Sequence, residues 1–282
     1  MRVTWVPRAQ VGEVGLDRRT LSPHRGGRLP KVMDSIKGHF QLQKIFHKTI
    51  CTFGIPESTL AQQIEQWEDN LPSNLHLAYL PNPLLGVRLR LSIYGTSEEE
   101  GLAELAENEA TLKQMLGDAI YGEGETSLQE TIGKTLKERG MTIGVAESCT
   151  GGFLASLFTS LAGASEYFYG GVVSYDNSVK MNILGVSKEV LDTYGAVSQE
   201  CAEQMAAGAK KALGTDYAIA TTGIAGPGGG TPEKPVGTVW IAVATPDGVI
   251  SKKFAFNSTR RNINIERFAA NALNMIRLQL IK

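Results

Sequence analysis

Alternation of apolar and polar positions predicts most of the elements in the first half of the chain. Residues 44–53, 75–80 and 87–94 alternate and are rich in β-forming residues, which is typical of strands with one solvated face. Ser58 and Ser97 each precede a run of apolar residues at helical spacing. The order strand, helix, strand, strand, helix predicts a small α+β domain with its helices on one side of the sheet.

The second half of the chain shows a different pattern, in which apolar β-type runs alternate with helical runs. The predicted strands here are 141–145, 167–175, 216–222, 236–245 and 249–256, and a final helix is predicted over 259–281. Strands that alternate with helices and end in an antiparallel pair predict a three-layer α/β/α domain with a mixed sheet. The fold class is therefore α/β, with a small α+β domain in front.

Composition divides the chain into three parts. Residues 1–35 are rich in arginine and interrupted by proline and glycine, without a periodic apolar face, so we expect an irregular or disordered arm. Residues 36–122 form the predicted α+β domain. A glycine-containing linker at 122–124 leads into the second domain, which we place at 123–282.

Charge and cysteine content exclude several classes of protein. The net charge is -1, so no global field favours nucleic acid or a membrane surface. No apolar run approaches the roughly 20 residues that span a bilayer. Three well-separated cysteines are typical of reduced thiols in a cytoplasmic protein. The α+β domain also lacks a Gly-x-x-Gly phosphate clamp, so we expect no nucleic-acid partner.

The most informative stretch is the turn at 146–152, which lies between a predicted strand and a predicted helix. It carries Ser148, Cys149 and Thr150 at a helix start, where free backbone N–H groups attract anions. Two interpretations stay open at this point. The turn is either an anion-binding or nucleophile site, or an ordinary helix cap followed by two glycines.

The distribution of histidine restricts the chemistry of the second domain. The histidines are His24, His39, His47 and His76, so none occurs between residues 77 and 282. Ser-His-Asp catalysis, Cys-His catalysis and histidine-ligated metal are thereby excluded, unless the first domain reaches across. A serine nucleophile here needs Lys, Tyr or a carboxylate as its base. Glu147 and Asp176 supply only one carboxylate per loop, so we expect no metal.

Three loops carry the candidate groups. The first holds Ser148, and the second lies around a strand that is preceded by Ser165 and followed by Tyr175 and Lys180. The third begins at Thr222 and continues into the glycine-rich segment 223–230, which has no P-loop ending. If the carboxyl ends of these strands lie together, the loops share one crevice.

Five short motifs occur in order along the second half of the chain. They are 146–152 (AESCTGG), 171–180 (GVVSYDNSVK), 195–198 (GAVS), 222–227 (TGIAGP) and 234–239 (KPVGTV). Together they resemble the C-terminal domain of the competence/damage-inducible protein CinA, the nicotinamide mononucleotide deamidase family. Residues 36–122 resemble the KH-like middle domain of CinA. Residues 1–35 do not resemble the molybdopterin-binding-like domain with which such proteins begin.

The resemblance implies hydrolysis of nicotinamide mononucleotide to nicotinate mononucleotide and ammonia, without metal or cofactor. It implies Ser165 as the nucleophile, Lys180 as its base and Tyr175 as a proton relay. Ser148 and the helix N–H groups behind it would then hold the substrate amide or the oxyanion formed from it.

The remaining residues that the resemblance assigns to substrate binding lie in the same loops. They are Thr150, Gly151, Thr222, Gly223, Gly226 and Arg260, with Arg261 as the alternative phosphate contact. A small-molecule nucleotide is the expected partner, and the sequence allows a homo-oligomer. The competing interpretation is a catalytically silent nucleotide-binding or regulatory module of the same fold.

Overall fold

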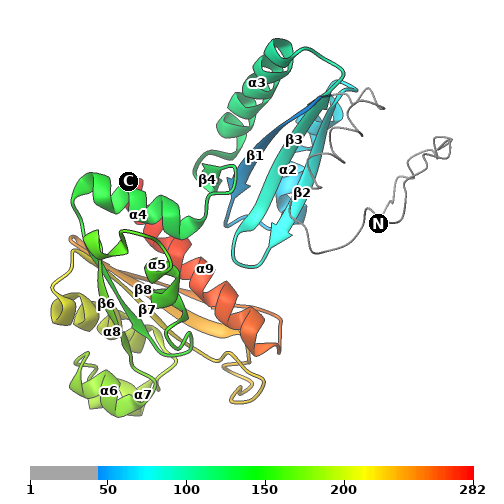
Figure 1. Ribbon diagram of the computed structural model, residues 1–282. Coiled ribbons are helices and arrows are strands. Elements are labelled where there is room, and N and C mark those ends of the chain that lie inside the picture. Colours follow the sequence, from blue (N-terminus) through cyan, green and yellow to red (C-terminus); the bar gives the residue numbers. More distant parts are fainter. Residues whose placement is uncertain (1–43) are drawn as a thin grey trace, which may run out of the picture. The chain divides into compact units, whose positions relative to one another are not determined.

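The computed structural model describes residues 44–282, so the predicted arm at 1–35 lies outside the described residues (Figure 1). Ile45–Lys282 is one compact unit. Its first sheet has four antiparallel strands in the order β2-β3-β1-β4. The strands are β1 (Ile45–Thr52), β2 (Leu75–Asn82), β3 (Gly86–Tyr94) and β4 (Ile120–Glu123).

Two helices cover one face of this sheet, as the alternating pattern predicts. They are α2 (Glu57–Asp69) and α3 (Glu98–Leu116), and the short helix η2 (Gly117–Ala119) follows α3. Leu89, Leu91 and Ile93 of β3 point toward the helices and are fully buried. The residues between them remain partly exposed on the other face.

Strand β4 is the element that the sequence pattern misses here. We expected a linker at 122–124 after the helix that begins near Ser97. Instead Ile120 to Glu123 pair with β1 across some 70 residues of chain. The prediction for the start of α2 was also wrong, because Pro56 and not Ser58 occupies the cap position.

The second domain has a five-stranded mixed sheet in the order β6-β5-β7-β8-β9. Strands β6, β5 and β7 are parallel, whereas β8 and β9 are antiparallel to their neighbours. The strands are β5 (Ile143–Glu147), β6 (Phe168–Val173), β7 (Tyr217–Gly223), β8 (Thr238–Thr245) and β9 (Gly248–Ala255).

Helices cover both faces of this sheet and complete the predicted α/β/α layers (Figure 1). The first layer consists of α4 (Leu128–Arg139), α5 (Phe153–Thr159) and α9 (Arg261–Leu280), and the short helix η3 (Ala164–Glu166) follows α5. The second layer contains α6 (Asn177–Asn182), α7 (Lys188–Thr193) and α8 (Gln199–Leu213). The three-layer fold with a mixed sheet is confirmed. None of the described helices is long and apolar enough to cross a membrane.

Small side chains let the second layer approach the sheet closely. Alanines on the face of the sheet toward α8 are almost fully buried against that helix: Ala146, Ala218, Ala220, Ala242 and Ala244. Gly208 of α8 also lies against the chain before α8. A Cβ at this position would come within 1.8 Å of the Leu184 carbonyl oxygen. The close packing of α8 therefore requires a residue without a side chain.

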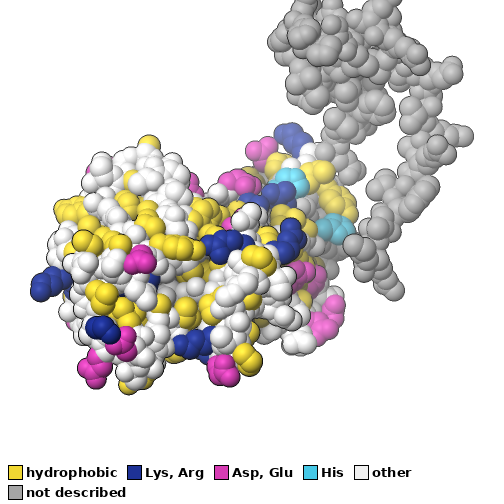
Figure 2. All heavy atoms as spheres, turned by 90° about the horizontal axis from the view of Figure 1, so that it is seen from below, with side chains coloured by type: hydrophobic (Ala, Val, Ile, Leu, Met, Phe, Trp, Pro, Cys, Tyr) yellow, Lys and Arg dark blue, Asp and Glu magenta, His cyan; other side chains and the backbone are white. Residues whose placement is uncertain are grey.

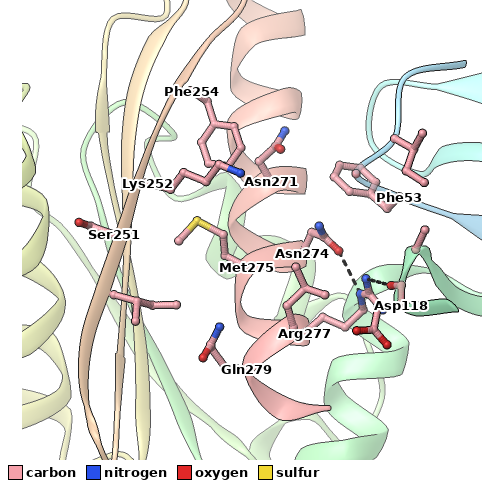
Figure 3. Close-up of a pocket in the computed structure, with 15 residues that line it drawn as sticks. Phe53, Asp118, Ser251, Lys252, Phe254, Asn271, Asn274, Met275, Arg277 and Gln279 are labelled. Atoms are coloured by element: carbon pink, nitrogen blue, oxygen red, sulfur yellow. Dashed lines mark hydrogen bonds between the residues drawn. The ribbon is translucent and has the colours of Figure 1, made fainter. Parts of the chain in front are cut away.

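The helix α9 makes a polar contact with the segment around β4 (Figure 3). The buried Arg277 guanidinium donates to the carbonyl oxygens of Asp118 at 2.6 Å and Ile120 at 3.2 Å, and Nε donates to Asn274 at 3.0 Å. The contact borders a pocket of about 410 Å³. None of the predicted site residues lines this pocket.

Gly208→Ala is expected to destabilise the protein, although alanine is normally the better helix former. The added methyl group overlaps the Leu184 carbonyl, and overpacking of this kind costs about 2 kcal/mol. Urea unfolding followed by circular dichroism measures the change. Ala207→Gly, at an exposed neighbouring position, is the control and should cost about 1 kcal/mol. A Gly208→Ala protein as stable as the parent would contradict this packing.

Candidate active site

The carboxyl ends of the three parallel strands meet at the turn that follows β5. The Ser148 N–H donates to the Thr221 carbonyl at 3.0 Å, and the Ser174 N–H donates to the Glu147 carbonyl at 2.8 Å. The register pairs Glu147 with Val173 of β6 and with Thr221 of β7. The loops after β5, β6 and β7 therefore lie side by side, as the predicted crevice requires.

Glu147 holds the turn through its buried side chain. The carboxylate is fully buried and accepts N–H groups from Gly152 at 3.0 Å, Leu154 at 2.9 Å and Ala155 at 2.7 Å. These are the donors at the start of α5, which an anionic ligand would otherwise use. The expectation that they bind the substrate oxyanion is therefore wrong for these three groups. Glu147 satisfies them itself and fixes the path of 148–152.

Hydroxyl groups of the turn and of β7 are also engaged within the protein. Thr150 Oγ1 and Thr221 Oγ1 share a buried hydrogen bond of 2.7 Å. The Thr222 hydroxyl donates to the Ala196 carbonyl at 2.6 Å. These contacts give Thr150 and Thr222 structural roles. Ser148, the serine of the turn, is half-buried.

Cys149 is excluded as a nucleophile by its surroundings. The thiol is buried, and burial raises its pKa to about 12. The helix start does not offset this burial, so the thiolate is a minor species near neutral pH.

Lys180 is the most unusual charged residue of the site. Its side chain is 1% exposed, and Nζ donates to the carbonyl oxygens of Ser174 at 2.6 Å and Tyr175 at 3.2 Å. In the described part of the chain it has no ion-pair partner among the carboxylates. Burial lowers the pKa of the Lys180 ammonium below its ordinary value. Because Ser174 also bonds to Glu147, the Lys180 amine lies next to the turn that carries Ser148.

Tyr175 and the start of α9 close another side of the site. Arg261 donates from Nη2 to the Tyr175 hydroxyl at 3.2 Å and from Nη1 to the Gly226 carbonyl at 3.0 Å. Arg260 instead occupies the cap position of α9, and its N–H donates to Ser258. Of the two arginines that the sequence left open, the structure brings Arg261 to Tyr175.

The glycine loop after β7 is packed against its neighbours. A Cβ on Gly223 would lie 2.6 Å from the Thr238 carbonyl oxygen, and one on Gly226 would lie 2.5 Å from Val236. Asn264 of α9 donates to the carbonyls of Ala225 and Ser258 and so fixes the loop further. Gly223 and Gly226 thus have packing reasons to be glycine.

Ser165 lies at the opposite end of the sheet. It is exposed in η3, before β6, whereas Tyr175 and Lys180 follow β6. A six-residue parallel strand rises about 3.3 Å per residue, so roughly 17 Å of strand separates these two loops. Within one chain, Ser165 therefore cannot share a hydrogen bond with Lys180. The Ser165–Lys180 pair that the family resemblance implies is therefore not formed within one chain, and it stays a prediction for a site shared between two chains.

A groove of about 460 Å³ borders the turn on the side of α9. Thr150, Gly151 and Gly152 line it on one side, and Asn262, Ile265 and Glu266 line it on the other. The volume falls in the range of small-molecule sites, about 300–1,000 Å³. Two of the predicted substrate-binding residues, Thr150 and Gly151, lie on this groove.

Two carboxylates of the site loops are used as helix caps. Glu147 binds the start of α5, and Asp176 accepts the Ser178 N–H at 2.8 Å to cap α6. The described residues contain no group of three or more His, Cys, Asp or Glu side chains arranged to hold a metal ion.

Sequence reasoning missed two residues that organise the site. Glu147 was considered only as a metal ligand, although a glutamate at the end of a buried strand before two glycines suggests an acceptor for the next helix. Asn264 lies three residues after Arg261 in an otherwise apolar helical stripe, and that position is a signal of a buried polar contact.

Comparison with known families identifies the family of the chain. Residues 125–280 match the CinA C-terminal domain, and residues 47–122 match the damage-inducible protein CinA KH domain. The chain belongs to the CinA family. The structure of competence/damage inducible protein CihA from Agrobacterium tumefaciens is 39% identical, with a TM-score of 0.53 over 55% of this chain and 94% of that chain.

Longer CinA-like proteins are similar over most of the chain. The relative from Flavobacterium psychrophilum is 46% identical, covering 84% of this chain and 57% of its own length. The relative from Chloroherpeton thalassium is 47% identical, covering 83% of this chain and 56% of its own length. The chain thus spans less than three fifths of the length of these CinA-like proteins.

Glu147→Gln is expected to destabilise the CinA domain. The amide keeps the size of the side chain but removes the charge and turns an NH₂ group toward an N–H donor of α5. Loss of a charged acceptor for buried donors costs about 3 kcal/mol. Thermal or urea unfolding measures the loss. Glu138→Gln, on the exposed face of α4, is the control and should be neutral within about 0.5 kcal/mol. Equal stability of the two variants would contradict the clamp.

Proposed function

We propose that this CinA chain hydrolyses the carboxamide of nicotinamide mononucleotide, releasing nicotinate mononucleotide and ammonia. The observation that carries the proposal is the buried Lys180 amine, which has two carbonyl acceptors and no ion-paired carboxylate in the described residues. A desolvated lysine loses its proton at a lower pH than an exposed lysine, and the neutral amine can then act as a base. The choice of nicotinamide mononucleotide as the substrate rests on the resemblance of the sequence motifs to the deamidase family.

In this proposal Ser148 is the nucleophile within a single chain. Its hydroxyl attacks the carboxamide carbon, and its proton passes to the neutral Lys180 amine, directly or through the Tyr175 hydroxyl. The Lys180 ammonium then protonates the leaving nitrogen, so ammonia departs and an ester to Ser148 remains. A water molecule, deprotonated by Lys180, hydrolyses this ester to the carboxylate.

The positive groups of the site suit the phosphate of the substrate. Arg261 lies at the start of α9 beside Tyr175 and is hydrogen-bonded to the glycine loop through the Gly226 carbonyl. Its planar guanidinium can donate hydrogen bonds to a phosphate while Nη1 keeps its bond to the Gly226 carbonyl. Thr150 and Gly151, which line the groove of about 460 Å³, would contact the remainder of the nucleotide.

Ser165 can serve as the nucleophile only if a second copy of the chain brings it to Lys180. This arrangement keeps the role that the family resemblance implies and requires a homo-oligomer with a shared site. It is a separate prediction from the Ser148 mechanism, and variants of the two serines distinguish them.

Ser148→Ala and Lys180→Met are each expected to lower ammonia release from nicotinamide mononucleotide at least about a hundredfold. Ser165→Ala is the matched control and should keep the parent rate. Thermal unfolding of each variant separates lost chemistry from lost folding. Activity lost in Ser165→Ala but kept in Ser148→Ala would contradict the Ser148 mechanism. A mixed oligomer of Ser165→Ala and Lys180→Met chains that recovers activity would then assign Ser165 to a shared site.

Substrate binding tests the alternative of a silent nucleotide-binding module. Calorimetry with nicotinamide mononucleotide should show binding by the parent protein and weaker binding by Arg261→Gln. Binding by the parent without any ammonia release would favour the silent module over the enzyme.

The pH dependence of kcat/KM should rise with pH through the lowered pKa of Lys180. The sign follows from the role of a base, because only the neutral amine accepts the proton and the ammonium form is inactive. The plateau should therefore begin below the pH at which an exposed lysine becomes neutral, about 10.4. Initial-rate measurements across the alkaline range, with stability checked at each pH, report this limb. A rate that falls over the same limb would contradict a base role for Lys180.

A further inference from the structure

One wall of the groove of about 460 Å³ beside the turn is formed by a face of α9 that the proposed mechanism does not use. Ile265 of this face packs against the core of the domain, and Asn262 and Glu266 line the groove with it. The three residues follow the spacing i, i+3, i+4, which places side chains on one side of a helix. Asn262 and Glu266 therefore face the groove across from Thr150 and Gly151.

The polar groups of the groove differ in whether they already have partners. The Thr150 hydroxyl takes part in the buried hydrogen bond to β7, and the Ser156 hydroxyl donates at 2.7 Å to a carbonyl oxygen of its own helix. Asn262 is exposed and Glu266 is half-buried. Neither of these two side chains has a hydrogen bond or an ion pair with a residue that the structure describes. An amide and a carboxylate beside the groove are therefore available to a ligand.

Charge restricts which part of a nucleotide can enter the groove. Among the described residues that line it, Glu266 alone is charged. Figure 2 views the molecule from the end at which α6 and α7 lie, and it shows charged side chains of both signs dispersed among hydrophobic and neutral ones. Single side chains, and not a broad field, therefore decide how a ligand lies here. The Glu266 carboxylate repels a phosphate, so the phosphate is left to Arg261 and an uncharged part of the nucleotide occupies the groove.

We propose that this groove is the ribose subsite of the nucleotide site and that Glu266 accepts hydrogen bonds from the ribose hydroxyls. The inference rests on the proposed function, which provides the nucleotide. An ionised carboxylate is purely an acceptor, and ribose offers neighbouring hydroxyl donors to it. Dinucleotide-binding folds use an acidic residue for the same contact.

The spacing along α9 fits a sugar that is joined to a phosphate. Asn262 directly follows Arg261, and Glu266 lies four residues farther along the helix, or about 6 Å. A ribose whose phosphate is bound by Arg261 therefore reaches both side chains. Ser148 and Lys180 act on the carboxamide, so Glu266 is expected to change KM and the choice of sugar while leaving kcat nearly unchanged.

NMR titration of the full chain with D-ribose 5-phosphate and with 2-deoxy-D-ribose 5-phosphate tests the proposal without any turnover. The parent protein should bind ribose 5-phosphate about tenfold more tightly, because the 2-hydroxyl donates to a charged acceptor. Glu266→Ala should bind the two sugar phosphates within about twofold of each other, because that acceptor is gone. Each ratio is measured within one protein, so a change in the folded fraction affects both sugars alike.

Two control variants should keep the ratio of the parent protein. Arg261→Gln should weaken both sugar phosphates to a similar extent, because both carry the phosphate. Glu138→Ala removes the same charge as Glu266→Ala from the exposed face of α4 and should leave both affinities unchanged.

A parent protein that binds the two sugar phosphates equally, or binds neither, would overturn the proposal. A Glu266→Ala protein that keeps the parent ratio would overturn it as well. If Glu266→Ala weakens nicotinamide mononucleotide but not ribose 5-phosphate, the carboxylate contacts the pyridinium ring and the ribose assignment is wrong. The outcome is separate from the test of deamidation. Ribose preference without ammonia release would keep the subsite and remove the enzyme, whereas ammonia release with equal sugar binding would do the reverse.

Discussion

The candidate site depends on the register in which β5 pairs with β6 and β7. Because these strands are parallel and in register at Glu147, the loops that follow all three strands lie together at the carboxyl end of the strands. Ser148, Lys180 and the segment beginning at Thr222 come together for this reason. The same register places Ser165 at the far edge, so strand direction decides which serine can meet Lys180 in a single chain.

Two buried ionisable side chains at this end of the sheet differ in how their charged forms are stabilised. Glu147 has three N–H donors that stabilise its negative charge, and it thereby fixes the turn. Lys180 has two carbonyl acceptors but no opposing carboxylate in the described chain, so burial favours its neutral form. A buried carboxylate with full hydrogen bonding is structural, whereas a buried lysine without a counter-ion is suited to accept protons. The environment, and not the residue type alone, assigns the two roles.

Local signals predicted much of the fold. Ser97 marks the start of α3, where it forms a capping box with Glu100, and the period-two pattern locates β3 to within a residue. Strand β4 was missed because four residues carry little periodicity, and their pairing with β1 is a tertiary contact. Helix caps and hydrophobic periodicity report short-range geometry, so they do not reveal tertiary contacts of this kind.

The site was predicted less completely, for reasons of geometry. The motifs identified Lys180, Tyr175 and the turn at Ser148, and the structure places these residues at one edge. The choice between Arg260 and Arg261 depends on where α9 begins, which sequence fixes only to within a few residues. The position of Ser165 follows from its place before β6. Strand direction puts it at the opposite end of the sheet from Lys180, whereas the family resemblance assigns the two residues to one site.

The central claim is that Lys180 is a desolvated base, and its own titration tests this most directly. Protein labelled with ¹³C at lysine Cε can be titrated by NMR, with the Lys180 signal assigned from Lys180→Met. Exposed Lys134 provides the internal reference. The account predicts that Lys180 titrates below the ordinary lysine value of about 10.4, while Lys134 titrates near it. A Lys180 signal that titrates with Lys134, or above it, would contradict the account.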